Sequence, residues 1–186
     1  MSSPSEPDDV KLVLSIFSSE KNLIDKVIDD FEVFFGSHDM VSKPLLFDYT
    51  RYYEREMGWP LFRRFVSFKK LISPEDLVDV KLKAYDVERQ YMNGDDRRVN
   101  IDPGIVSAER LVLATGKNYT HRIYLSHGIY ADLTLIYRFG TFRSLEWTYP
   151  DYADEYVIGF FNSVRADYLL KRSKNIDKEH DSLRKK

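Results

Sequence analysis

The pattern of hydrophobic and polar residues changes its period several times along the chain, and it predicts alternating strands and helices. Apolar side chains at helical spacing fill 20–35, which predicts a helix that ends at Gly36. A second helix begins with Ser73 as N-cap and Pro74 in its first position, and we expect Gly94 to close it. Apolar runs rich in strand-forming residues predict strands at 11–18, 45–53, 61–71 and 97–101.

The order strand, helix, strand, strand, helix, strand is that of a ferredoxin-like unit. We therefore predict an α+β fold with a mostly antiparallel sheet, in a single domain at 10–172. A β-meander at 105–147 follows the ferredoxin-like part, and a C-terminal helix with Asp151 as its cap closes the domain. Residues 1–9 are predicted as a disordered tail and 173–186 as a charged tail.

The segment HRIYLSHGIYADLTLIYRF defines the meander best, because its apolar residues occupy alternate positions. The parity survives the turn if the hairpin loop has three residues, 126–128, with glycine in the left-handed position. In that register Tyr124 lies opposite Tyr130, and Arg122 lies opposite Asp132. We expect the apolar parity to face the core.

Composition narrows the classes of protein. The chain has 186 residues, 43% hydrophobic and 31% charged, so it is long and apolar enough for one substantial core. The net charge is −2, so we do not expect nucleic acid as a partner. There is no cysteine, no basic leader with an apolar run, and no apolar stretch that could span a membrane. We expect a soluble cytoplasmic protein.

Known motifs for cofactors are missing. ATGKN resembles part of a phosphate-binding loop, but Leu111 stands at the first glycine position and Asn118 follows Lys117, so it is not a Walker A motif. The histidines are too far apart in sequence and in the predicted hairpin to share a metal ion. We predict no structural metal site, and Mg²⁺ held by carboxylates stays open as a cofactor.

The stretch RRVNIDPG combines a polar strand face with a corner. Pro103 and Gly104 suit the central positions of a type II turn. Before them, Arg98, Asn100 and Asp102 share one strand parity, and apolar residues take the other. This row of guanidinium, amide and carboxylate is either a solvated face or a binding face.

Four motifs in this order, RRVNIDPG, LVLATGK, HRIYLSHGIYADLTL and WTYPDY, resemble the prokaryotic domain-of-unknown-function family 4416. The resemblance covers about 10–172. Members are sometimes labelled GTP-binding, but this chain has neither a Walker A motif nor N-K-x-D, and the resemblance implies no established activity. The chain departs from the family pattern at Ile105, at Ala84 and Tyr85, and at Asp132, where the family has Glu.

The resemblance implies a set of polar motif residues: Tyr53, Glu56, Lys81, Glu88, Arg98, Asn100, Asp102, Lys117, His121, Arg122, Tyr124 and Asp132. Several of them fall on the polar strand parities. We hypothesise a pocket for an anionic small molecule, phosphorylated or nucleotide-like. An anion clamp would consist of Arg98, Arg122, Lys117 and His121. Orienting or acid–base groups would be Asp102, Glu56 and Asp132. No nucleophile–base pair stands out, so no catalytic residue is predicted.

Two alternatives stay open beside the pocket. In the first, the chain is a non-catalytic module that binds RNA or a protein through exposed Tyr124, Tyr130 and Phe68. In the second, the polar residues are structural, and Arg122 and Asp132 form a buried pair with every hydrogen bond made internally. Neither alternative predicts an oligomeric state.

Overall fold

The computed structural model describes residues 3–184, with side chains as far as Ser173. Its helices are α1 (Lys21–Phe35), α2 (Glu54–Met57), α3 (Leu77–Gln90) and α4 (Glu155–Arg184), and a 3₁₀ turn at Pro74–Asp76 leads into α3. Its strands are β1 (Val10–Ser18), β2 (His38–Val41), β3 (Leu45–Phe47), β4 (Leu61–Ile72), β5 (Asn100–Val106), β6 (Arg110–Thr115), β7 (Arg122–Ser126), β8 (Ile129–Arg138) and β9 (Thr141–Ser144).

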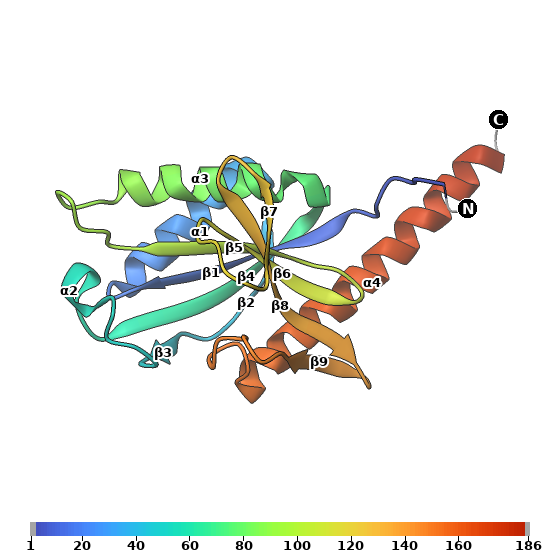
Figure 1. Ribbon diagram of the computed structural model, residues 1–186. Helices are drawn as coiled ribbons and strands as arrows, with labels where there is room; N and C mark the ends of the chain where they lie inside the picture. Colours follow the sequence, from blue (N-terminus) through green and yellow to red (C-terminus); the bar gives the residue numbers. More distant parts are fainter. Residues whose placement is uncertain (1–2, 185–186) are drawn as a thin grey trace.

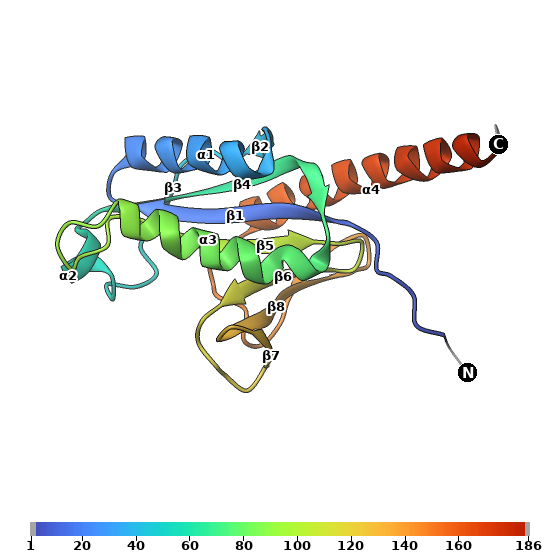
Figure 2. The ribbon, with the colours of Figure 1, turned by 90° about the horizontal axis from the view of Figure 1, so that it is seen from above.

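All nine strands belong to one antiparallel sheet in the order β2-β4-β1-β5-β6-β8-β7, with β3 also on β4 and β9 also on β8. The order β2-β4-β1-β5 and the crossovers through α1 and α3 form a ferredoxin-like unit, and the α+β prediction is confirmed. The second strand of this unit is β2, which was not predicted, in place of the predicted strand at 45–53. Figure 1 shows α1 and α3 on one side of the sheet and α4 on the other. Figure 2 shows the β7–β8 hairpin standing out from the rest of the sheet.

Alternate residues of the central strand β1 build two different cores. Leu12, Leu14 and Ile16 face α1 and α3, where they pack with apolar side chains of both helices. Val13 faces the other way and packs with residues of α4, β6 and β9. Every residue of β1 is buried, as expected of a strand that is covered on both faces.

The helix ends partly follow the predictions. The Ser73 hydroxyl accepts a hydrogen bond from the backbone N–H of Glu75, and the Asp76 carboxylate accepts one from the backbone N–H of Ser73, so the predicted cap forms. Helix α3 ends at Gln90, before Gly94. The predicted cap of α4 is wrong: Asp154 accepts from the first turn, whereas Asp151 is buried against an arginine of β4.

The strand predicted at 45–53 is shorter than expected. Only Leu45–Phe47 pairs with β4, and the chain then leaves the sheet toward α2. Phe47 and Tyr53 pack on Phe17 of β1, with ring centroids 5.0 and 4.9 Å from that ring. Burial of these rings over the sheet competes with strand extension, so the segment folds back across the face that α4 leaves uncovered.

The predicted turn at Pro103-Gly104 is also wrong, because β5 continues through it. Pro103 pairs with Leu14 of β1, and Gly104 pairs with both β1 and β6. A Cβ atom at Gly104 would lie 2.7 Å from the carbonyl oxygen of Val112. The glycine is therefore required for the close approach of two strands, and the left-handed backbone of a turn plays no part.

The predicted register of the β7–β8 hairpin is confirmed, although its loop differs. Tyr124 pairs with Tyr130 and Arg122 with Asp132. The loop has two residues, His127 and Gly128, both with positive φ, and a bulge in β7 supplies the extra residue that preserves parity. The apolar parity of β7 does not face the core.

The exposed edge of the sheet explains that difference. β7 is the outermost strand, and Ile123 in its middle is 71% exposed. On β8 the apolar parity is buried at Ile129 and Leu135, but Asp132 and Thr134 of the polar parity are buried as well. Both faces of β8 are therefore buried. One face presents apolar side chains, and the other presents the polar side chains of Asp132 and Thr134.

Both predicted tails lie partly outside the described residues, at 1–2 and 185–186. Residues 3–9 have no regular secondary structure, and α4 continues through most of the predicted C-terminal tail. Asp8 forms an ion pair with Arg172 of α4. Within the described residues, every helix is too short or too polar to cross a membrane.

Candidate functional site

A cavity of about 400 Å³ lies on the sheet face that α4 leaves partly uncovered. β5 pairs with β1 over its whole length but with β6 only from Gly104 onward, so β5 and β6 separate beside the cavity. The segment around α2 and the chain leading into α4 form the other walls. The lining contains eight charged side chains, the cations Arg63, Lys81, Arg97, Lys117 and Arg122 and the carboxylates Asp102, Asp132 and Asp151.

Helix α3 contributes two side chains where β5 and β6 separate. Lys81 is buried, and its ammonium group donates to the carbonyl oxygen of Ile101 at 2.8 Å and to the carboxylate of Asp102 at 3.2 Å. Tyr85 also lines the cavity, and its hydroxyl oxygen would lie 2.5 Å from a Cβ atom at Gly116. Gly116 therefore leaves room for this tyrosine beside the end of β6.

The carboxylate of Glu88, one turn further along α3, is also buried. It accepts a hydrogen bond from the backbone N–H of Ile101 at 2.6 Å. Burial raises the pKa of Glu88 to about 7, against the opposing effect of Lys81. Glu88 does not line the cavity, so its role is to hold β5 against α3.

Arg97 occupies the position that the sequence pattern assigned to Arg98. Its guanidinium group binds both carboxylate oxygens of Glu56, at 2.5 and 2.8 Å, and donates to the side-chain oxygen of Asn100 at 3.0 Å. Hydrogen bonds from Arg97 lower the pKa of Glu56. Asn100 in turn donates to Asp102 at 2.8 Å. This chain of bonds fixes α2 to the start of β5.

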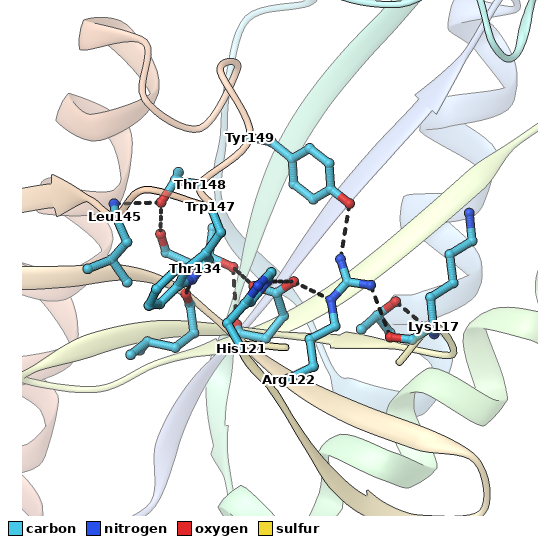
Figure 3. A network of polar contacts seen from close by, with 11 residues as sticks. Lys117, His121, Arg122, Thr134, Leu145, Trp147, Thr148 and Tyr149 are labelled. Carbon is cyan, nitrogen blue, oxygen red and sulfur yellow. Dashed lines mark hydrogen bonds and ion pairs between the residues drawn. The ribbon is translucent and has the colours of Figure 1, made fainter. Parts of the chain in front are cut away.

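Arg122 and Asp132 form the opposite wall. Figure 3 shows the guanidinium group of Arg122 between Tyr149 and the segment of Lys117. The guanidinium group of Arg122 donates to Asp132 at 2.8 Å and to the carbonyl oxygen of Lys117 at 3.0 Å. The Nε2 atom of His121 lies 3.3 Å from the same carboxylate, and the imidazole ring stacks on Trp147 at a centroid distance of 4.9 Å. His121 therefore lies behind Asp132 and outside the cavity lining.

The segment after β9 carries Tyr149 to this wall. Trp147 donates to the carbonyl oxygen of Leu133 at 2.7 Å, and Thr148 donates to that of Thr134 at 2.6 Å. Both bonds hold the segment against β8 (Figure 3). The hydroxyl of Tyr149 then accepts a hydrogen bond from Arg122 at 3.1 Å. Arg122 is thus held by three partners that lie far apart in the sequence.

Lys117 differs from the other cations of the cavity. It follows the end of β6, and its ammonium nitrogen lies 5.6 Å from the ring centroid of Tyr52. The other four cations each form an ion pair with a carboxylate. Within residues 3–173, no carboxylate lies within 4.0 Å of the Lys117 ammonium group. Among the described side chains, the cavity therefore holds one positive charge that no carboxylate neutralises.

A comparison with protein families identifies the chain. The model of a family described as a domain of unknown function, DUF4416, matches residues 8–168. The chain belongs to the DUF4416 family. No curated protein and no solved structure matches it. Family membership therefore confirms the predicted resemblance and supplies no activity, so any function of this DUF4416 protein has to be argued from the cavity.

The structure brings most of the predicted residues together. The cavity is lined by Tyr53, Lys81, Asn100, Asp102, Lys117, Arg122 and Asp132. Glu56 and His121 stand one contact behind it, through Arg97 and Asp132. Tyr124 is exposed on the hairpin, away from the cavity, and packs on Tyr130 at a centroid distance of 5.2 Å.

The predicted position of Arg98 in the clamp is wrong. Its guanidinium group binds the carboxylate of Glu20 at 2.6–2.8 Å on the exposed surface. β5 begins only at Asn100, so strand parity does not extend back to Arg98. The hydroxyl of Ser18 donates to the carbonyl oxygen of Arg98 at 2.6 Å, which holds the chain there in a different geometry.

Sequence reasoning missed several lining residues. The motif WTYPDY supplies Tyr149, Asp151 and Tyr152, although it carried only the family resemblance and the predicted helix cap at Asp151. This motif is rich in aromatic and acidic residues and lies between the predicted strand and helix, and this composition could have indicated that it lines a site. Arg63 lies on β4 in a run of basic and aromatic residues, where alternation alone could not show which face would hold a cavity.

The lining offers no cluster of metal ligands. Among the described residues, no group of three or more His, Cys, Asp or Glu side chains is placed to hold a metal ion. Asp102 and Asp132, the candidate carboxylates, each accept hydrogen bonds from cationic side chains. A Mg²⁺ ion at this cavity would therefore need most of its ligands from water and from a bound phosphate.

Proposed function

We propose that the cavity binds an anionic small molecule, with a phosphate group as the best match. The observation that carries this proposal is Lys117, the cation of the lining without a carboxylate partner. A positive charge beside a partly enclosed, low-dielectric space attracts an anion more strongly than one on an open surface. The neighbouring guanidinium group of Arg122 has N–H donors beyond the three used in its hydrogen bonds.

The alternatives explain less of this arrangement. Arg122 and Asp132 are almost completely covered and bonded internally, as a structural role requires, but they also line a cavity that contains an unpaired lysine. A flat aromatic surface for RNA or a protein would need Phe68, which is fully buried. The ion pairs are then best regarded as the walls of the site, which hold the lining in place before a ligand arrives.

A thermal-shift screen with pyrophosphate, sugar phosphates and nucleotides, with and without Mg²⁺, tests the proposal. A ligand at about 100 times its Kd stabilises the folded protein by about 2.7 kcal/mol, which such a screen resolves. We expect at least one phosphate to raise Tm, and Lys117→Gln to abolish the shift. Lys70→Gln is the matched control, because Lys70 is also exposed and lies on β4 away from the cavity.

Absence of a shift with every phosphate would overturn the proposal. So would a shift of equal size in the wild-type protein and in Lys117→Gln, because the anion would then bind elsewhere. We assign no reaction to the site, since within the described residues no hydroxyl of the lining donates to a carboxylate or an imidazole, and the Lys81 amine is held in its ion pair with Asp102.

A further inference from the structure

The floor of the cavity holds a second set of donors that the anion site does not use. Arg63 of β4 lies there, 6% exposed, with its guanidinium carbon 4.2 Å from the ring centroid of Phe47 and 4.9 Å from that of Phe17. It forms an ion pair with Asp151. Within the described chain its Nε–H has no hydrogen-bond acceptor.

Tyr152 lines the same floor and is 3% exposed. Its ring packs edge-on against Phe65. Its hydroxyl oxygen lies beside Ser15 and Arg63, whose hydrogen bonds oppose the rise in its pKa, but no described residue accepts a hydrogen bond from this hydroxyl. Burial raises the pKa of this hydroxyl, so it stays protonated at any ordinary pH and can donate. Two buried donors therefore line one end of the cavity without protein acceptors.

Buried donors without partners are rare in folded proteins, because each loses its hydrogen bond to water. An acceptor supplied by a ligand would explain both. The charge of Arg63 is already balanced by Asp151, so an uncharged acceptor suits the floor better than a second phosphate. The aromatic side chains of Phe17, Phe47 and Tyr152 line this end of the cavity and favour a flat group.

We propose that the floor binds a planar, uncharged ring whose carbonyl oxygen accepts hydrogen bonds from Tyr152 and Arg63. This proposal rests on the proposed anion site and narrows its ligand to a phosphorylated compound that carries such a heterocycle. The ring lies over the strands β1 and β4, and the phosphate lies near Lys117, beyond the end of β6. The sheet order separates these two ends by β5, so the ligand extends across the cavity.

Titration calorimetry with matched probes tests the ring subsite. Ribose 5-phosphate supplies the sugar and phosphate alone, and uridine and inosine 5′-monophosphates add a ring with a carbonyl oxygen. We expect at least one nucleotide to bind the wild-type protein roughly tenfold or more tightly than ribose 5-phosphate. Tyr152→Phe should weaken that nucleotide roughly three- to tenfold, the effect of one lost hydrogen bond, and leave ribose 5-phosphate unchanged.

Equal affinity for all three probes, each lost in Lys117→Gln, would overturn the ring subsite and leave the anion site standing. The same holds if Tyr152→Phe leaves nucleotide affinity unchanged. Binding of none of the three, together with no response to pyrophosphate, would overturn both proposals.

Stability of the free protein gives a second readout that needs no ligand. If the Tyr152 hydroxyl donates to no protein acceptor, Tyr152→Phe should leave Tm unchanged or raise it. Tyr168→Phe is the control, because the Tyr168 hydroxyl donates to the carbonyl oxygen of Asp9 at 3.0 Å and its loss should lower Tm. A fall in Tm for Tyr152→Phe as large as that for Tyr168→Phe would overturn the inference.

Discussion

The two faces of the sheet around β1 use the same strands for opposite purposes. Toward α1 and α3, alternate residues of β1, β4 and β5 form a continuous apolar core. On the other face, the same strands present Arg63, Asn100 and Asp102 to the cavity. The apolar face is stabilised mainly by burial, whereas the charges on the cavity face, apart from Lys117, depend on partners from other segments. The comparison indicates that the face toward α1 and α3 supplies stability, whereas the cavity face carries the candidate binding site.

The largest expected effect belongs to the apolar face. Phe68 of β4 is fully buried there, so Phe68→Ala should lower the free energy of unfolding by about 3–5 kcal/mol, through lost burial and the cavity left behind. Urea denaturation measures this. Ile123→Ala, on the exposed edge strand, should change it by less than about 0.5 kcal/mol. Similar losses in both variants would contradict the assignment of the core.

The cavity face should be sensitive to single charges. Asp132→Asn leaves the covered guanidinium group of Arg122 without its carboxylate and should cost roughly 3 kcal/mol. Asp86→Asn, in an exposed pair with Arg89, should cost between about 0 and 1 kcal/mol. Chemical denaturation of both variants measures these losses in the free energy of unfolding. If the two losses were equal, the wall of the cavity would not depend on this pair.

Glu88 of α3 is buried against β5 and makes stability depend on pH. Its pKa rises from 4.5 to about 7 on folding because of burial, so the folded state holds a proton that the unfolded state has lost. Stability from this group is complete below pH 4.5 and falls by about 2–3 kcal/mol as pH rises through 7. Unfolding free energies at pH 5 and pH 8 measure the loss.

Glu88→Gln removes this proton and should flatten the profile. The variant should therefore gain stability relative to the wild-type protein between pH 5 and pH 8. A difference between the two proteins that stays constant over this range would show that Glu88 is ionised in the folded state throughout.

The smallest expected difference in stability is between substitutions of two adjacent arginines. Arg97→Ala breaks a two-bond pair with Glu56 that is partly covered, and it should cost about 1–2 kcal/mol. Arg98→Ala breaks an exposed pair with Glu20 and should cost about 0.5 kcal/mol or less. Thermal unfolding of the two variants compares them directly. A larger loss of stability in Arg98→Ala than in Arg97→Ala would contradict the assignment of Arg97 as the arginine that holds this part of the site.

The sequence pattern correctly predicted those features that depend on interactions between residues close in sequence. The cap at Ser73, the helical period of 20–35 and the hairpin register all depend on neighbours in sequence, and the structure confirms them. Pro103 and Gly104 misled because their usual place is a turn, whereas here a close strand contact selects the glycine. Alternation correctly separated the faces of β5 but could not show where the strand begins.

The cavity itself depends on contacts between distant segments. Arg63 meets Asp151, Arg97 meets Glu56, and Arg122 meets Tyr149. None of these pairs shares an element, so no periodicity in the sequence could join them. The predicted set was nevertheless close, since the family motifs gather residues from several strands and helices that converge on this face.

A crystal structure of the protein with pyrophosphate tests the central claim most directly. The account predicts the anion inside the cavity, with an oxygen within hydrogen-bonding distance of the Lys117 ammonium group and the ion pairs of Arg122 and Arg97 unchanged. An anion bound only outside the cavity, for example displacing Glu20 from Arg98, would contradict it.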